Sequence, residues 1–257
     1  MNKRNKQLMA AIAILVVALI LSYSSTQKKE IVKDADVVLA LDVSGSMGDP
    51  GQSGTKLDDA KKSATEFLRK VEPKFRIGLV TFESDVYLDA SLESSREYLI
   101  DQIGSMDSGG NTALGDAMAL SIEHLTSKGR SNVDKYIVLM TDGLQTEVIE
   151  YDLYEATEMA VSDGIMIYTV AFGSDAALSD LRNIAGQTGG QYFYAASGSE
   201  LVDRFVQVAE QISRKPEYYY GSRSLMAAVV FLIIFLPTIV KTGKIAVDAM
   251  KEKFMKV

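Results

Sequence analysis

The chain has 257 residues, of which 47% are hydrophobic and 24% charged, a composition that suits one large globular domain or two small ones. It contains no cysteine and one histidine, which excludes a disulfide framework, a thiolate metal site and a histidine-rich metal site. The net charge is −7, but both ends are basic and the middle is acidic. This pattern argues against nucleic acid as a partner and favours ends that lie beside an anionic membrane face.

The first predicted element is an uncharged apolar segment, residues 8–24, which follows Lys3, Arg4 and Lys6. Its apolar stretch is a little shorter than the ~20 residues of a full span, and flanking polar residues extend it to a workable length. Two interpretations stay open, an uncleaved membrane anchor and a signal peptide that is cleaved after the small residues near Ser24. We expect the anchor, with residues 1–7 as a basic cytoplasmic N-terminus.

The middle of the chain, residues 33–214, alternates buried strands with amphipathic helices and is predicted to be one domain. We expect strands at 34–41, 75–82, 85–90, 135–140, 165–172 and 190–194. We expect helices at 56–71, 96–103, 114–125, 151–163, 176–185 and 200–212. This alternation predicts an α/β fold, a doubly wound and mostly parallel sheet that is covered by helices on both faces and flanked by two transmembrane helices.

A second apolar segment, residues 224–240, follows three tyrosines and is predicted to be a transmembrane helix rather than a buried core helix, because it has no polar face. The basic tail, 241–257, carries apolar residues at helical spacing, so an amphipathic helix on the inner leaflet and a solvated tail both stay open. Because both basic flanks are expected in the cytoplasm, the two spans place the middle domain on the extracytoplasmic side of the cell membrane.

A group of oxygen-bearing side chains follows the ends of two predicted strands. Asp42, Ser44 and Ser46 alternate after the first strand, so an extended loop points all three the same way. Asp142 ends a later strand, and Thr112 lies in a glycine-containing loop between them. Carboxylates and hydroxyls without nitrogen or sulfur form a hard-oxygen set that suits Mg²⁺ or Mn²⁺. Ligand sites of open α/β sheets lie at the carboxyl ends of the strands, where these residues are expected.

This constellation resembles the von Willebrand factor A (VWA) domain and its metal-ion-dependent adhesion site, whose pattern is Asp-x-Ser-x-Ser, a distant threonine and a later aspartate. All five positions are filled here in that order, by Asp42, Ser44, Ser46, Thr112 and Asp142. The resemblance implies that the three hydroxyls contact a Mg²⁺, Mn²⁺ or Ca²⁺ ion, that the two carboxylates hold it largely through water, and that its open position takes a carboxylate of a partner protein. It implies a binding module rather than an enzyme.

The arrangement of a VWA-like domain between two spans loosely resembles membrane-anchored prokaryotic members of the family, including the Bat-type aerotolerance proteins. Proteins of that type are often encoded beside AAA+ ATPases. The resemblance therefore implies a membrane complex with an AAA+ ATPase-linked system, without assigning the aerotolerance role.

Three other interpretations of the same residues stay open. An aspartate at a strand end is a candidate nucleophile of a metal-dependent phosphotransferase or hydrolase, although those enzymes usually carry a second aspartate where Ser44 stands. A scaffold subunit with a purely structural metal, and a degenerate site in which Asp42 only caps a turn, are the further alternatives. The sequence has no glycine-rich GK[ST] loop and no G-x-S-x-G motif, which argues against a nucleotide site and a serine hydrolase.

Overall fold

A computed structural model of the chain describes residues 26–31, 34–173, 178–213 and 215–220. The chain divides into two compact units, one formed by residues 32–215 and the other by residues 1–31 together with 216–257. Strands β1 (Thr26–Ile31) and β8 (Lys215–Tyr220) pair with each other as a separate two-stranded sheet, which was not predicted from the sequence.

The predicted spans at 8–24 and 224–240 and the predicted tail at 241–257 lie outside the described residues. Within the described ranges, every helix is too short or too polar to cross a bilayer. The two spans therefore stay predictions.

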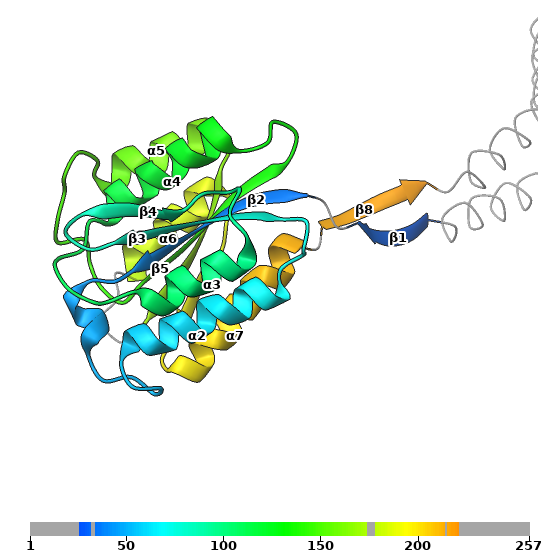
Figure 1. Cartoon of the computed structure of the whole chain (residues 1–257). Helices are drawn as coiled ribbons and strands as arrows, with labels where there is room; N and C mark the ends of the chain where they lie inside the picture. The colour runs from blue at the N-terminus through cyan, green and yellow to red at the C-terminus, as the bar shows by residue number, and fades with distance from the viewer. Residues whose placement is uncertain (1–25, 32–33, 174–177, 214, 221–257) are drawn as a thin grey trace, which may run out of the picture. The chain divides into compact units, whose positions relative to one another are not determined.

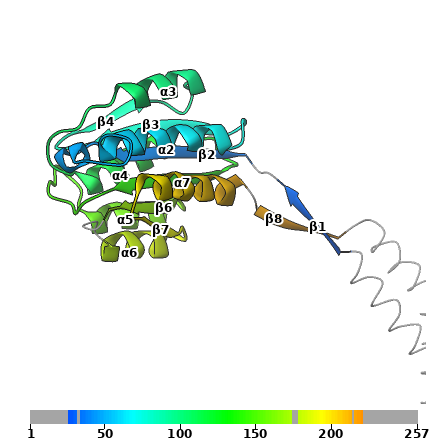
Figure 2. The same ribbon diagram turned by 90° about the horizontal axis from the view of Figure 1, so that it is seen from below.

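The unit of residues 32–215 is built on a six-stranded sheet with the order β4-β3-β2-β5-β6-β7. All neighbouring pairs are parallel except the antiparallel pair of β3 and β4. The strands are β2 (Ala35–Asp42), β3 (Arg76–Phe82), β4 (Val86–Ala90), β5 (Asp134–Thr141), β6 (Met166–Phe172) and β7 (Tyr192–Ala195). Figure 2 shows β4 and β7 as the two edge strands, at opposite ends of the strand order.

Helices cover both faces of this sheet, as Figure 1 shows for α4 and α5 on one side and for α2, α3 and α7 on the other. Successive β2 side chains alternate between two separate apolar cores. Val37 and Leu39 belong to the core that includes α2 and α7, and Val38 belongs to the core that includes α4 and α5. The helices are α2 (Lys56–Lys70), α3 (Arg96–Ser105), α4 (Leu114–Lys128), α5 (Leu153–Ser162), α6 (Leu178–Thr188) and α7 (Gly198–Ser213). The predicted α/β fold with a mostly parallel, doubly covered sheet is confirmed.

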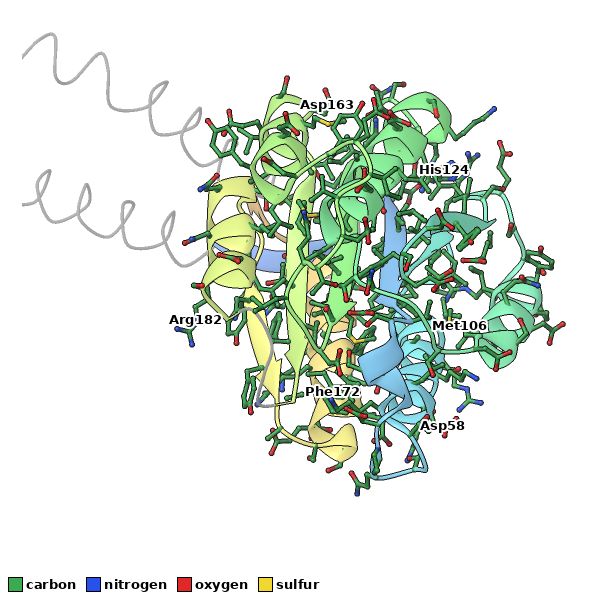
Figure 3. All side chains as sticks on the ribbon, turned by 90° about the vertical axis from the view of Figure 1, so that its left-hand side faces the viewer. Asp58, Met106, His124, Asp163, Phe172 and Arg182 are labelled. Carbon is green, nitrogen blue, oxygen red and sulfur yellow. The ribbon has the colours of Figure 1, made fainter. Side chains whose placement is uncertain are left out.

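The order of the strands determines where a ligand site can form. From the central strand β2 the chain passes to β3 on one side and later to β5 on the other, so the connections after β2 and β5 diverge at the carboxyl edge of the sheet. Ligands of such folds bind at this switch point. Figure 3 views the domain from this edge, where β6 ends at Phe172.

Candidate metal centre

The ends of the adjacent strands β2 and β5 bring two aspartates together. The two strands are parallel and in register, with Leu41 opposite Met140, so Asp42 and Asp142 each stand at or just beyond the end of their strand. The Thr141 hydroxyl donates a hydrogen bond of 2.5 Å to Asp42 Oδ2 and joins the two strand ends directly.

The turn that follows β2 places both serines between the aspartates. A short 3₁₀ helix, η1 (Gly45–Gly48), folds the chain back immediately after Ser44. The Ser44 backbone N–H donates to Asp42 Oδ1 at 2.8 Å, and the hydroxyl oxygens of Ser44 and Ser46 are 3.2 Å apart. Ser46 Oγ then donates to Asp142 Oδ1 at 2.7 Å. Four of the five predicted residues therefore form one continuous hydrogen-bonded network, and Ser46 is its solvent-exposed member.

Thr112, the fifth predicted residue, lies on a loop that touches this turn through its backbone. The Gly45 N–H donates to the Gly110 carbonyl at 3.0 Å, and Gly110 adopts a φ of 66°, a conformation that favours glycine. Thr112 itself is buried, and its N–H donates to Thr146 Oγ1 at 3.0 Å. Hydrogen bonds from Gly45 to Gly110 and from Gly109 to the Val43 carbonyl tie the Thr112 loop to the turn that carries the two serines.

Burial sets the electrostatics of the first aspartate. Asp42 has 0% exposed surface, and removal from water raises its pKa to about 6 from the usual 3.8. The hydrogen bonds that Asp42 accepts from Ser44 and Thr141 oppose this rise, while the nearby charge of Asp142 adds to it. A cation beside these carboxylates would relieve the unfavourable burial of negative charge.

The second aspartate already has a cationic partner. Lys56, the first residue of α2, places its Nζ 2.7 Å from Asp142 Oδ2 and 3.6 Å from Asp49 Oδ2. Burial alone would lower the pKa of Lys56, but the hydrogen bonds and charges of Asp142 and Asp49 together outweigh burial and raise it. Lys56 was not among the residues that the sequence singled out.

An exposed apolar loop borders the candidate site. Residues 143–151 follow Asp142, and the side chains of Leu144, Val148 and Ile149 are each more than half exposed on this loop. The loop is held in place by Asp116, whose carboxylate accepts hydrogen bonds of 2.8–2.9 Å from three consecutive backbone N–H groups at the loop's end. The loop is therefore fixed at its end by Asp116, and it exposes three large apolar side chains next to the site.

Comparison with known proteins identifies the family. The sequence profile of the von Willebrand factor type A domain matches residues 36–208, about two thirds of the chain. The chain belongs to the VWA family. The profile begins in β2 and ends in α7, so the family covers the whole six-stranded sheet.

Curated relatives share this VWA region at low identity. An uncharacterized protein of Borreliella burgdorferi is 29% identical over 213 residues, which are 79% of this chain and 59% of that protein. A UPF0353 protein of Mycolicibacterium gilvum is 26% identical over 202 residues, 69% of this chain and 60% of that protein. The chain thus spans about three fifths of the length of these relatives.

Solved structures support the same fold. A VWA protein from Catenulispora acidiphila aligns with a TM-score of 0.62 at 19% identity, over 71% of this chain and 43% of that one. An aerotolerance-related membrane protein from Bacteroides fragilis aligns with a TM-score of 0.58 at 19% identity, over 69% and 99% of the two chains. Proximal thread matrix protein 1 from the mussel byssus, with a zinc-occupied MIDAS motif, aligns with a TM-score of 0.59 at 21% identity, over 75% of this chain and 50% of that one.

The side chains at this edge of the VWA domain fit a divalent cation. In the described residues no three histidine, cysteine, aspartate or glutamate side chains gather closely enough to hold a metal by themselves, so a site here depends on serine and threonine hydroxyls. Two buried carboxylates and two hydroxyls in one hydrogen-bonded network supply hard oxygen ligands of the kind that Mg²⁺ and Mn²⁺ prefer. Asp42, Ser44, Ser46 and Asp142 of this network, with Thr112 on the adjacent loop, stay the predicted ligands of such an ion.

Two polar residues of this network escaped the sequence analysis, and each carried a local signal. A lysine at the first position of a helix opposes the helix dipole, so Lys56 required a nearby acid. Thr141 precedes Asp142 at the end of β5, and a hydroxyl that follows the buried apolar run of this strand needs a buried acceptor, which Asp42 supplies.

Proposed function

We propose that this VWA domain binds a divalent cation, Mg²⁺ or Mn²⁺, at Asp42, Ser44, Ser46, Thr112 and Asp142, and through that ion a carboxylate of a partner protein. The observation that carries this proposal is the continuous network of two buried carboxylates and two hydroxyls at the carboxyl edge of the sheet. Because Ser46 is its exposed member, an ion held there would face solvent and keep a position for an external ligand.

The geometry of Asp42 favours a binding module over a phosphotransferase. A nucleophilic aspartate needs a carboxylate oxygen that can reach substrate. Both oxygens of Asp42 accept hydrogen bonds within the domain, and the residue has no exposed surface.

The apolar loop supports a protein as the partner. Clustered exposed apolar side chains beside a polar site are typical of interaction surfaces. Leu144, Val148 and Ile149 would pack against apolar side chains that flank the partner's carboxylate, while the metal orients the complex.

We further propose that the predicted spans at 8–24 and 224–240 anchor the domain on the extracytoplasmic side of the cell membrane, as part of a membrane complex linked to an AAA+ ATPase. The basic flanks support this orientation, and the likeness in fold to an aerotolerance-related membrane protein supports the location. The chain has no cysteine, so single cysteines report topology cleanly. A Ser53→Cys variant should react with an impermeant maleimide in intact cells, and a Lys256→Cys variant should react only after lysis.

Thermal unfolding with and without Mg²⁺ tests the metal site. Binding to the folded state alone adds about 2.7 kcal/mol of stability at a hundredfold excess over the dissociation constant. The midpoint of the wild-type protein should rise, and that of Ser46→Ala should not. Ser53→Ala, the same change at an exposed serine in the loop before α2, should behave as the wild type does. An equal response of wild type and Ser46→Ala would contradict the proposed site.

A pull-down then tests the partner. The wild-type chain should capture a protein in Mg²⁺ that is released by EDTA and is not captured by Ser46→Ala. Capture that is indifferent to both changes would assign the interaction to another surface.

A further inference from the structure

Lys56 lies at the amino-terminal end of a helix, a position that disfavours a positively charged side chain. It is the first residue of α2, directly after the N-cap Thr55, whose side chain forms a capping box with Asp58. The amino-terminal end of a helix carries partial positive charge, which favours acids and opposes a lysine. A residue that breaks a local rule is expected to be compensated elsewhere, and here the compensation comes from the candidate metal centre.

The contacts of Lys56 are concentrated on one carboxylate of that centre. Its Nζ lies 2.7 Å from Asp142 Oδ2, and the Asp142 side chain has no exposed surface. The other oxygen, Oδ1, accepts the hydrogen bond from Ser46. The lysine stem passes the end of β6, where a Cβ built on Gly173 would lie 3.9 Å from its Cε. Both Asp142 oxygens are thus occupied, and Lys56 supplies the positive charge.

A second carboxylate offers Lys56 an alternative position. Asp49 Oδ2 lies 3.6 Å from the same Nζ, and the Asp49 side chain is 63% exposed. The ammonium can therefore turn from the buried Asp142 to the exposed Asp49 without leaving the edge of the site.

We infer that Lys56 is the internal counter-ion of the metal centre, which neutralises Asp142 in the metal-free domain and which a divalent cation must displace towards Asp49. This inference rests on the proposed function and adds a residue that sets how tightly the metal is held. Charges of the same sign a few ångströms apart repel, even with the screening of water, enough to weaken binding by about tenfold. The domain would then hold its metal weakly until a partner carboxylate completes the coordination.

Mn²⁺ binding to the full chain, measured from the free Mn²⁺ signal in electron paramagnetic resonance, tests this role. Lys56→Gln should bind Mn²⁺ at least about tenfold more tightly than the wild type, because its metal no longer meets the ammonium. Lys56→Arg keeps the charge and should stay near the wild-type affinity. The matched control is Lys62→Gln, which removes the same charge from an exposed position of the same helix and should change the affinity less than twofold.

The outcomes separate this inference from the function on which it rests. If the wild type binds Mn²⁺ and Lys56→Gln binds it equally or more weakly, Lys56 is not a counter-ion, while the metal site stands. If no variant binds Mn²⁺, both ideas fall. The loss of the charge partner of Asp142 can make Lys56→Gln unstable without metal. In that case Mn²⁺ must raise the unfolding midpoint of Lys56→Gln by more than it raises the midpoint of the wild type. A smaller rise would overturn the inference.

Discussion

Replacing Asp42 by asparagine should stabilise the metal-free domain at neutral pH. Burial raises the pKa of Asp42 from 3.8 to about 6, so the folded state holds the proton more tightly than the unfolded state does. The protonated Asp42 therefore stabilises the folded state relative to a charged Asp42. This stabilisation is fully present below pH 3.8 and is lost as the pH rises through 6. Above that pH, a shift of this size corresponds to about 3 kcal/mol of lost stability.

Asparagine keeps the shape of aspartate and removes the charge. Its side-chain oxygen can accept the 2.8 Å hydrogen bond from the Ser44 N–H, and its amide group can donate to the Thr141 hydroxyl, which turns to accept. Asp42→Asn should therefore gain up to about 3 kcal/mol over the wild type at pH 7.5 and should match it near pH 3.8. It should also lose the response to Mg²⁺, since a carboxylate of the proposed site is gone.

Urea unfolding of a fragment spanning 32–215, in EDTA at pH 7.5 and at pH 4, measures both differences. This fragment contains all the residues of the two apolar cores. Asp101→Asn, the same change at an exposed position of α3, is the matched control and should leave the stability within about 0.5 kcal/mol. An Asp42→Asn domain that is less stable than the wild type at pH 7.5 without metal would refute the reasoning.

Three further predictions concern residues outside the metal centre. His124 is buried, its Nε2 accepts the Leu92 N–H at 3.0 Å, and burial lowers its pKa, so the contribution of His124 to stability should fall as the pH drops from 7.5 to 5, in the opposite direction to that of Asp42. His124→Gln, which retains an acceptor, should therefore become more stable relative to the wild type as the pH drops, measured by urea unfolding, and a difference that does not change with pH would exclude a role for His124. Asp116→Ala should speed amide hydrogen exchange in residues 149–151 at least tenfold, and unchanged exchange would show that Asp116 does not hold the loop. Phe205→Ala should lower the free energy of unfolding by about 3–5 kcal/mol, because its ring packs edge-on against Phe67 at 6.2 Å between α7 and α2; a loss below 1 kcal/mol would contradict that packing.

The regular elements could be predicted because their signals are local. A parallel strand that is buried on both faces needs an unbroken apolar run, and β2 and β5 show such runs up to their polar ends. The boundaries were less exact at helix ends, where α4 extends to Lys128 rather than 125. The last turn of that helix is polar and carries no periodic signal. The pair of β1 and β8 was missed because their sequences, TQKKEI and KPEYYY, carry no apolar strand pattern and the two strands lie far apart in the chain.

The sequence by itself determined the fold class, because buried apolar strands alternate with amphipathic helices along the chain, and its resemblance to the VWA pattern predicted the five residues of the proposed metal site. Only the tertiary structure decided what these residues contact. Lys56 and Asp142 are 86 positions apart, and Asp116 lies 33 positions from the first loop amide that it binds. Such pairings depend on the strand order and on the register between β2 and β5. Burial likewise arises only when the sheet is covered on both faces, so the raised pKa of Asp42 is a property of the folded domain.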